Sequence, residues 1–142
     1  AGDGPLRPEI EHQADQLCLG DSLRFLGMRT DVPQLLSAMD LFLLPSRWEG
    51  LGIVAVEAQA SGLPCVCSHK VPREVKLTDQ LRFLPEEAYT APAAWCDVME
   101  QALSVGRRDG RDAVCAGGYD IRRQARRLES LYLHGTLPSQ EL

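Results

Sequence analysis

The sequence predicts an α/β fold built on a parallel sheet. Short apolar runs alternate along the chain with longer segments of helical character. The run at 41–44 is apolar at every position and ends at Pro45, which is typical of a strand that is buried on both faces. Strands that alternate with helices run parallel, because each crossover returns the chain to the same end of the sheet. Ligands of such sheets bind beyond the carboxyl ends of the strands.

Turn and capping residues mark the ends of the expected elements. Pro5 and Pro33 suit the first turns of helices, where a backbone amide has no helical partner to lose. Gly62 suits the left-handed position that follows a helix, and Asp120 is a good N-cap. We therefore expect helices at 5–18, 32–39, 51–60, 91–105 and 120–133, strands at 23–27, 41–44, 64–68 and 81–84, and a polar connection at 106–118.

The composition is that of an ordinary globular domain. The chain has 142 residues, of which 44% are apolar and 25% are charged, enough for one hydrophobic core. Its net charge of −5 argues against a nucleic-acid partner, because phosphate binding needs a basic surface. No apolar run approaches the roughly 18 residues of a membrane-spanning helix, and the N-terminus lacks a signal-peptide pattern. We expect a cytoplasmic protein.

The cysteines and histidines indicate neither disulfides nor a metal site. The five cysteines include no Cys-x-x-Cys pair. Cys65 and Cys67 alternate on an expected strand, so both point to one face and cannot easily form a bridge, which favours a reduced, cytoplasmic chain. The three histidines are scattered and no Asp-x-Asp pair occurs. We expect no bound metal.

The segment at 45–58 carries the most chemical information. It contains a strand end, a loop with Gly50 and Gly52, and the start of a helix. The free amides of a first helical turn, together with the helix dipole, suit an anion such as a diphosphate. Glu49 and Glu57 must then face neutral hydroxyls, and a carboxylate matches a vicinal diol well. Spacing alone leaves a second interpretation open, in which Glu49 only complements the helix dipole and Glu57 is a solvated helix residue.

The surroundings of the two glutamates resemble those of a known enzyme family. A pair of glutamates separated by seven residues, placed after a Pro-Ser strand end, is similar to the signature of the retaining family 4 glycosyltransferases of the two-Rossmann-domain type. The likeness includes 2–6, 25–27, 31–36, 40–42 and 57–66. The segments 68–75, 81–84, 118–121 and 131–133 look like those of bacterial exopolysaccharide and capsular polysaccharide glycosyltransferases.

The resemblance implies a role for each matching residue. Glu57 would bind the ribose hydroxyls of the donor, and Glu49 would contact the transferred sugar and serve in catalysis. The backbone amides of the glycine loop would meet the sugar and diphosphate. The implied donor-binding residues are, besides Glu57, Gly50, Leu51, Gly52, Ile53, Arg47, Arg73 and Glu74. For Arg47 a solvated loop position, and for Arg73 and Glu74 a purely structural turn, stay open as alternatives.

The resemblance also implies a reaction and a division of the protein. A hexosyl group would pass from a UDP- or GDP-linked sugar to a polysaccharide or glycolipid acceptor, with retained configuration and without metal or other cofactor. The chain would be a partial Rossmann-like, doubly wound domain that lacks its first strand-helix units and its partner, the N-terminal acceptor domain. We expect weak donor binding and little activity from it alone. A standalone nucleotide-sugar-binding or interaction module, and a nonfunctional truncation product, are the alternatives.

The C-terminal segment has two interpretations. We divide the chain into a nucleotide-sugar-binding domain at 1–118 and a helix with its tail at 119–142, which we expect to pack on that domain. The helix is amphipathic and basic, so peripheral contact with an anionic membrane at its inner face is the alternative. Two aromatic side chains have open roles: His69 as a donor contact or plain loop residue, and Trp48 as a sugar contact or loop anchor. Trp95 is expected in the core.

Overall fold

The computed structural model describes residues 1–137 and contains two compact units, which divide between Val32 and Pro33. The first unit contains α1 (Arg7–Gln16) and a short 3-10 turn, η1 (Gly20–Ser22). The expected strand at 23–27 is wrong. Only Gly27 pairs, through a single antiparallel bridge in which the Gly2 amide donates to the Gly27 carbonyl over 2.7 Å. A strand needs a ladder of neighbours, and no second pairing forms among the described residues.

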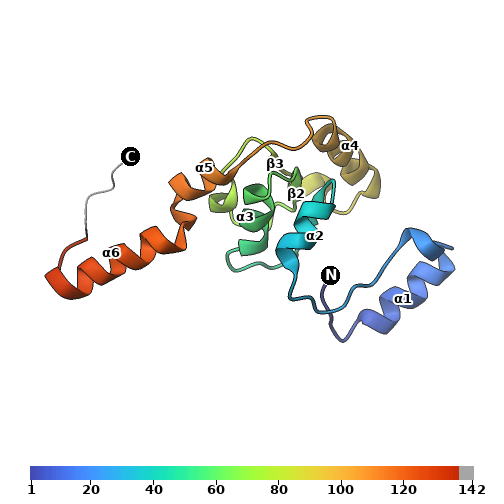
Figure 1. Ribbon diagram of the computed structural model, residues 1–142. Helices are drawn as coiled ribbons and strands as arrows, with labels where there is room; N and C mark the ends of the chain where they lie inside the picture. Colours follow the sequence, from blue (N-terminus) through green and yellow to red (C-terminus); the bar gives the residue numbers. More distant parts are fainter. Residues whose placement is uncertain (138–142) are drawn as a thin grey trace. The chain divides into compact units, whose positions relative to one another are not determined.

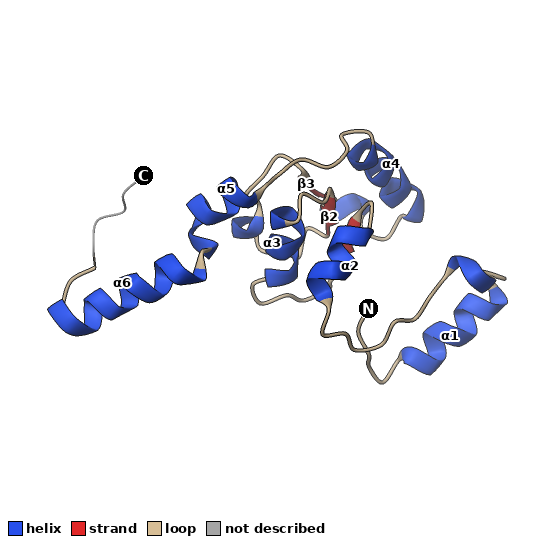
Figure 2. Ribbon diagram, in the orientation of Figure 1, coloured by secondary structure: helices blue, strands red, loops and turns tan. Residues whose placement is uncertain are grey.

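The second unit is organised by a parallel sheet, as predicted. Its strands are β1 (Phe42–Leu44), β2 (Cys65–Cys67) and β3 (Leu81–Phe83), in the order β1-β2-β3. Phe42 aligns with Cys65, and Cys65 aligns with Leu81. All three strands therefore end at the same edge of the sheet, which is the edge where ligands of such sheets bind. Figure 2 shows these strands in red among the blue helices.

Helices alternate with the strands along the chain (Figure 1). The α/β class predicted from the sequence is confirmed. Both α3 and α4 contact β2. The connection expected at 106–118 is wrong in its second half, which is helical. The helices are α2 (Val32–Ala38), α3 (Ile53–Ala60), α4 (Pro92–Leu103), α5 (Arg111–Val114) and α6 (Ile121–His134), with short turns η2 (Arg73–Val75), η3 (Glu86–Ala88) and the π-helical η4 (Cys115–Tyr119).

Burial follows strand position within the sheet. Every residue of the central strand β2 is buried, as expected for a strand that is covered on both faces. The same prediction for β1 is wrong, because Leu43 is 41% exposed. The two apolar runs look alike in sequence. They differ in burial because β1 is an edge strand of the described sheet and β2 is its central strand.

A buried amide joins α3 to the segment that follows η2. The Gln59 side chain is fully buried. Its Nε2 donates to the carbonyls of Ala55 and Val75, over 2.9 and 2.7 Å. Its Oε1 accepts from the amides of Leu77 and Thr78 and from the Thr78 hydroxyl, each over 3.0 Å. One side chain thereby satisfies polar groups of a loop that has no strand or helix to pair with.

Arg107 closes two helix ends. Its guanidinium donates to the carbonyls of Leu36 (2.6 Å) and Ser37 (3.0 Å) and to that of Met39, at the end of α2. It also donates to the Ser61 carbonyl after α3, over 3.0 Å. The last carbonyls of a helix lack intrahelical partners, so a single cation there satisfies both ends and complements both dipoles.

Candidate functional site

A chain of hydrogen bonds joins the loops that follow β1 and β2. The buried Ser68 hydroxyl donates to the Ser46 carbonyl over 2.6 Å and accepts from the Lys70 amide over 3.2 Å. Tyr89, which follows η3, binds the loop after β1 as well, because its hydroxyl donates to the Pro45 carbonyl over 3.0 Å. The loop at 45–52, which carries Glu49 and two glycines, is therefore fixed at Pro45 and Ser46.

Glu49 is held at this edge. The Ser46 hydroxyl donates to its Oε2 over 3.1 Å. Its Cγ lies 3.3 Å from the position that a Cβ on Gly52 would occupy. Burial and, after it, the negative charge of Glu49 raise the pKa of Cys67, the last residue of β2, to about 12. Glu49 is thus a half-buried, oriented carboxylate at the strand ends.

Gly52 provides the close approach on which the site is built. Its φ of +73° and ψ of 40° are left-handed, a conformation that costs glycine little. A Cβ there would also meet the Val71 side chain at 3.2 Å. The loop after β2 therefore packs directly against the residue that starts α3, and the two sequence segments predicted to form the site lie together.

The start of α3 has free backbone donors. No side chain caps the helix, and within residues 1–137 the amides of Ile53 and Val54 donate to no acceptor. The helix begins two residues later than predicted, because Leu51 and Gly52 still belong to the loop. The uncapped first turn retains the partial positive charge that suits an anion.

Glu57 lies on the exposed side of α3. It follows Ile53, the first residue of α3, by about one helical turn. The carboxylate is exposed and makes no hydrogen bond or ion pair with any described residue. Side chains on a helix lean toward its N-terminus, so Glu57 covers the surface over the turn with the free amides. It is accessible to a ligand that sits at the helix start.

The remaining predicted residues differ in how closely they approach this centre. Arg73 and Glu74 are exposed between Val71 and Val75, the two buried valines of the segment that packs on Gly52. The Arg73 guanidinium stacks 4.0 Å from the centre of the Phe83 ring. Arg47 is exposed and has no partner among the described residues. The structure orients Arg73 and leaves Arg47 unrestrained.

The structure places the three aromatic residues that the sequence singled out. Trp48 is 91% exposed, so it does not anchor the loop. The expected core position of Trp95 is wrong, because its ring is only half-buried and donates from Nε1 to the Tyr89 carbonyl over 3.0 Å. The His69 side chain is only 10% exposed, packs edge-on against Tyr89, and lies 3.7 Å from the exposed Glu86 carboxylate. Neither ring nitrogen of His69 has a hydrogen-bond partner among the described residues.

Sequence reasoning missed the residues that support the site. Ser46 orients Glu49, and Ser68 joins the two loops. Gln59 ties α3 to the segment after η2. The Pro-Ser context of Ser46 was visible, but a serine after a strand is common in any loop. The signal for Gln59 was its position on a helix face that is otherwise apolar. An amide buried on such a face requires hydrogen-bond partners.

The thiols of β2 are expected to resist modification in the native protein. Burial raises the pKa of Cys65 and of Cys67, and both are buried, whereas the other three cysteines are exposed. Because the thiolate is the reactive form, we expect iodoacetamide at pH 8 to label Cys18, Cys96 and Cys115 in the native protein and all five after denaturation. Intact mass spectrometry counts the adducts. Equal labelling of Cys67 in the native state would contradict this burial.

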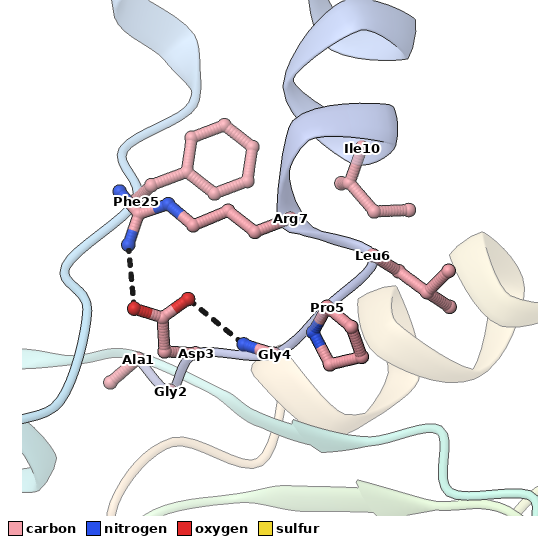
Figure 3. A pocket seen from close by; sticks show the side chains of 9 residues that line it. All are labelled: Ala1, Gly2, Asp3, Gly4, Pro5, Leu6, Arg7, Ile10 and Phe25. Atoms are coloured by element: carbon pink, nitrogen blue, oxygen red, sulfur yellow. Dashed lines mark hydrogen bonds and ion pairs between the residues drawn. The ribbon is translucent and has the colours of Figure 1, made fainter.

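The N-terminal turn lines a pocket in the first unit (Figure 3). It measures about 430 Å³ and lies beside Pro5, Leu6 and Phe25. Asp3 accepts from the Gly4 amide over 2.9 Å and pairs with Arg7 over 3.5 Å. Asp3 is therefore a residue that stabilises the turn and the start of α1.

Comparison with known proteins identifies the family. The profile of a family described as "Glycosyl transferases group 1" matches residues 1–104. The chain belongs to this family. Membership in the group 1 glycosyltransferases confirms the resemblance on which the site residues were assigned, and the parallel α/β sheet is consistent with the Rossmann-like domains of that type. The individual residue roles stay predictions.

Several bacterial proteins are similar to the chain. The "Putative glycosyltransferase EpsF" of Bacillus subtilis (strain 168) is 35% identical over 136 residues, which cover 93% of this chain and 35% of the relative. An Escherichia coli protein named "UDP-Gal:alpha-D-GlcNAc-diphosphoundecaprenol alpha-1,3-galactosyltransferase" is 44% identical over 70 residues, or 48% of this chain and 18% of the relative. The "Vi polysaccharide biosynthesis protein VipC/TviE" of Salmonella typhi is 43% identical over 65 residues, or 46% of this chain and 11% of the relative.

The chain spans about a third of the length of the Bacillus subtilis relative and less of the other two. Among residues 1–137, no helix combines the length and apolarity that crossing a bilayer requires.

Proposed function

We propose that this chain carries the donor-binding part of a retaining, metal-independent hexosyltransferase that uses a UDP- or GDP-linked sugar. The observation that carries the proposal is the start of α3, where two free amides follow the left-handed Gly52, with Glu49 fixed on one side and Glu57 exposed one turn further on. Amides and carboxylates in this order match a diphosphate flanked by a sugar at one end and a ribose at the other.

The chemistry proposed for the helix start is stabilisation of the leaving diphosphate. When the glycosidic bond to phosphate breaks, negative charge grows on the phosphate oxygens. Fixed backbone donors stabilise such charge without reorganising at the moment of reaction, and the dipole of α3 acts in the same direction. The acceptor oxygen bonds to the anomeric carbon on the face that the diphosphate leaves, and the departing phosphate accepts the proton of that acceptor hydroxyl.

The two carboxylates are proposed to bind neutral groups. Glu49 is oriented by Ser46, so it is poised to accept hydrogen bonds from hydroxyls of the transferred sugar and to favour the positive charge that develops on the ring. The Glu57 carboxylate has no hydrogen-bond partner among the described residues, and its two oxygens match the two hydroxyls of a ribose. Both assignments agree with the repulsion that a diphosphate exerts on a nearby carboxylate.

The names of the relatives support the proposed acceptor class. The Escherichia coli relative is named for a lipid-linked diphosphate acceptor and the Salmonella relative for polysaccharide biosynthesis. We infer that the acceptor of the complete protein is a growing polysaccharide or a glycolipid, and that a further acceptor-binding domain completes the enzyme.

Donor binding by the chain itself is expected to be weak. The loop at 45–52 holds a single cation, Arg47, so charge-assisted contacts to the diphosphate are few. Isothermal titration with UDP and with GDP is expected to give a Kd weaker than about 10 μM for the preferred nucleotide, or about −7 kcal/mol. Submicromolar binding would show that the chain holds a complete donor site, and no binding of either nucleotide at millimolar concentration would contradict the proposed function.

A further inference from the structure

The imidazole of His69 is buried without hydrogen-bond partners at the carboxyl end of β2. His69 follows Ser68, whose hydroxyl joins the loops after β1 and β2. Its side chain is only 10% exposed, and both ring nitrogens are buried without a hydrogen-bond partner among the described residues. Because buried polar atoms are nearly always paired, the neutral imidazole is held here at a cost in free energy.

Two charged side chains and a phenol surround this imidazole. The Glu86 carboxylate, on η3, lies 3.7 Å from its Nε2. The ammonium group of Lys70 lies 3.5 Å from the same Glu86 oxygen. The Tyr89 ring stands edge-on to the imidazole with the ring centres 5.2 Å apart, and Trp95 of α4 packs against Tyr89. Glu86 therefore favours a positive charge on His69, and Lys70 opposes it.

Protonation changes what this imidazole can bind. The neutral ring carries one N–H group, whereas the imidazolium donates from both nitrogens. A charge-assisted hydrogen bond to Glu86 would shorten the separation of Nε2 and the carboxylate from 3.7 Å to about 2.8 Å. The side chains of His69 and Glu86 therefore have two arrangements, one for each protonation state of the ring.

Glu86 is connected to the candidate donor site through Tyr89. The Tyr89 amide donates to the Glu86 carbonyl over 3.1 Å, and the Tyr89 hydroxyl donates to the Pro45 carbonyl over 3.0 Å. Pro45 begins the loop that carries Glu49. A movement of Glu86 toward His69 is therefore transmitted to this loop.

We propose that His69 is a positioning residue of the candidate donor site, whose neutral form keeps the loop at 45–52 in the binding geometry. Its protonation draws Glu86 inward and loosens the hold of Tyr89 on Pro45. The inference rests on the proposed function, because the loop is the one assigned to the donor. Donor affinity then falls as the pH decreases through the range in which histidines change charge.

An NMR titration tests the coupling without a ligand. The ¹⁵N-labelled protein is titrated from about pH 8 to about pH 6, where histidines gain a proton. We expect the backbone amide resonances of Gly50 and Gly52 to shift together with the His69 ring, and this shift to be absent in H69Q. H12Q, which removes an exposed histidine of the first unit, should retain it. Amide resonances of Gly50 and Gly52 that do not follow His69 would overturn the proposal.

Two further variants test the route and leave the buried ring in place. E86Q removes the partner of the imidazolium at a side chain that is 75% exposed, so the fold is kept and the loop amides should shift less. Y89F keeps the ring but removes the hydroxyl that binds Pro45. In Y89F the His69 ring should still titrate while the loop amides respond less. Unreduced shifts in both variants would show that Glu86 and Tyr89 do not transmit the change.

Nucleotide affinity connects the coupling to the proposed function. If His69 is half protonated at the lower pH, the binding-competent fraction is halved, so the Kd for UDP or GDP should rise about twofold more than in H69Q. Titration of the nucleotide phosphate is common to both proteins and cancels in this ratio. A relative fall in Kd would mean that the imidazolium contacts the phosphate directly, which overturns the positioning role. Absence of nucleotide binding with the NMR coupling intact would contradict the proposed function alone.

Discussion

Replacement of Gln59 by leucine is expected to destabilise the protein strongly. Leucine has a similar volume, so the packing around the site changes little. The buried carbonyl of Val75 loses its partner, as do the partly buried amides of Leu77 and Thr78 and the Thr78 hydroxyl. Because each buried group without a partner costs about 1–3 kcal/mol, Q59L should lower the free energy of unfolding by about 3 kcal/mol or more.

Urea unfolding followed by circular dichroism measures this loss, and α4 provides the control. Gln101 is exposed and its side chain has no partner among the described residues, so Q101L is expected to change the free energy of unfolding by no more than about 0.5 kcal/mol. A loss below about 1 kcal/mol in Q59L, the lower end of the cost of one unpaired buried group, would mean that the segment after η2 reaches water or other partners when the amide is removed.

Substitution of Glu57 by glutamine is expected to produce the largest change in nucleotide binding. Hydrogen bonds to a charged group contribute about 1.5–3 kcal/mol each, and glutamine retains the shape but only one acceptor oxygen. We expect E57Q to weaken binding of the preferred nucleotide by about tenfold or more, without a change in unfolding free energy, because the carboxylate has no partner in the described structure. Isothermal titration or ligand-observed NMR measures the affinity.

The control for E57Q is E100Q on α4, which removes one negative charge from another exposed helix position. If the nucleotide is repelled by the general negative charge of the protein, both variants should bind it slightly better. If Glu57 binds hydroxyls, only E57Q weakens binding. Equal affinities for the two variants would contradict a role for Glu57 in the donor site.

The sequence predicted the sheet well because its strands have a strong local signature. The apolar runs at 41–44, 64–68 and 81–84 became β1, β2 and β3 within one residue at each end. The strand predicted at 23–27 was wrong because a strand needs a pairing partner elsewhere in the chain, and of these residues Gly27 alone pairs. The predicted burial of Leu43 was wrong for a similar reason, because the position of a strand within the sheet decides how far it is buried.

The candidate site was predictable as a set of segments but not as a geometry. Glu49 and Glu57 could be assigned to one site because the glycosyltransferase family that the sequence resembles has two glutamates at this spacing around a glycine loop. The support of Glu49 by Ser46, and of the loops by Ser68, comes from side-chain hydrogen bonds with no periodic signature. The start of α3 was predicted two residues early, because Leu51 is as compatible with a helix as with a loop, and only the left-handed Gly52 separates them.

The proposed pairing of Glu57 with a nucleotide ribose is tested most directly by a thermodynamic cycle. The affinities of the unsubstituted protein and of E57Q are measured for UDP or GDP, whichever binds, and for its 2′-deoxy analogue. We predict that removing the 2′-hydroxyl weakens binding to the unsubstituted protein but scarcely affects E57Q, with a coupling of about 1 kcal/mol or more. Equal losses in both proteins would show that Glu57 and the ribose do not meet.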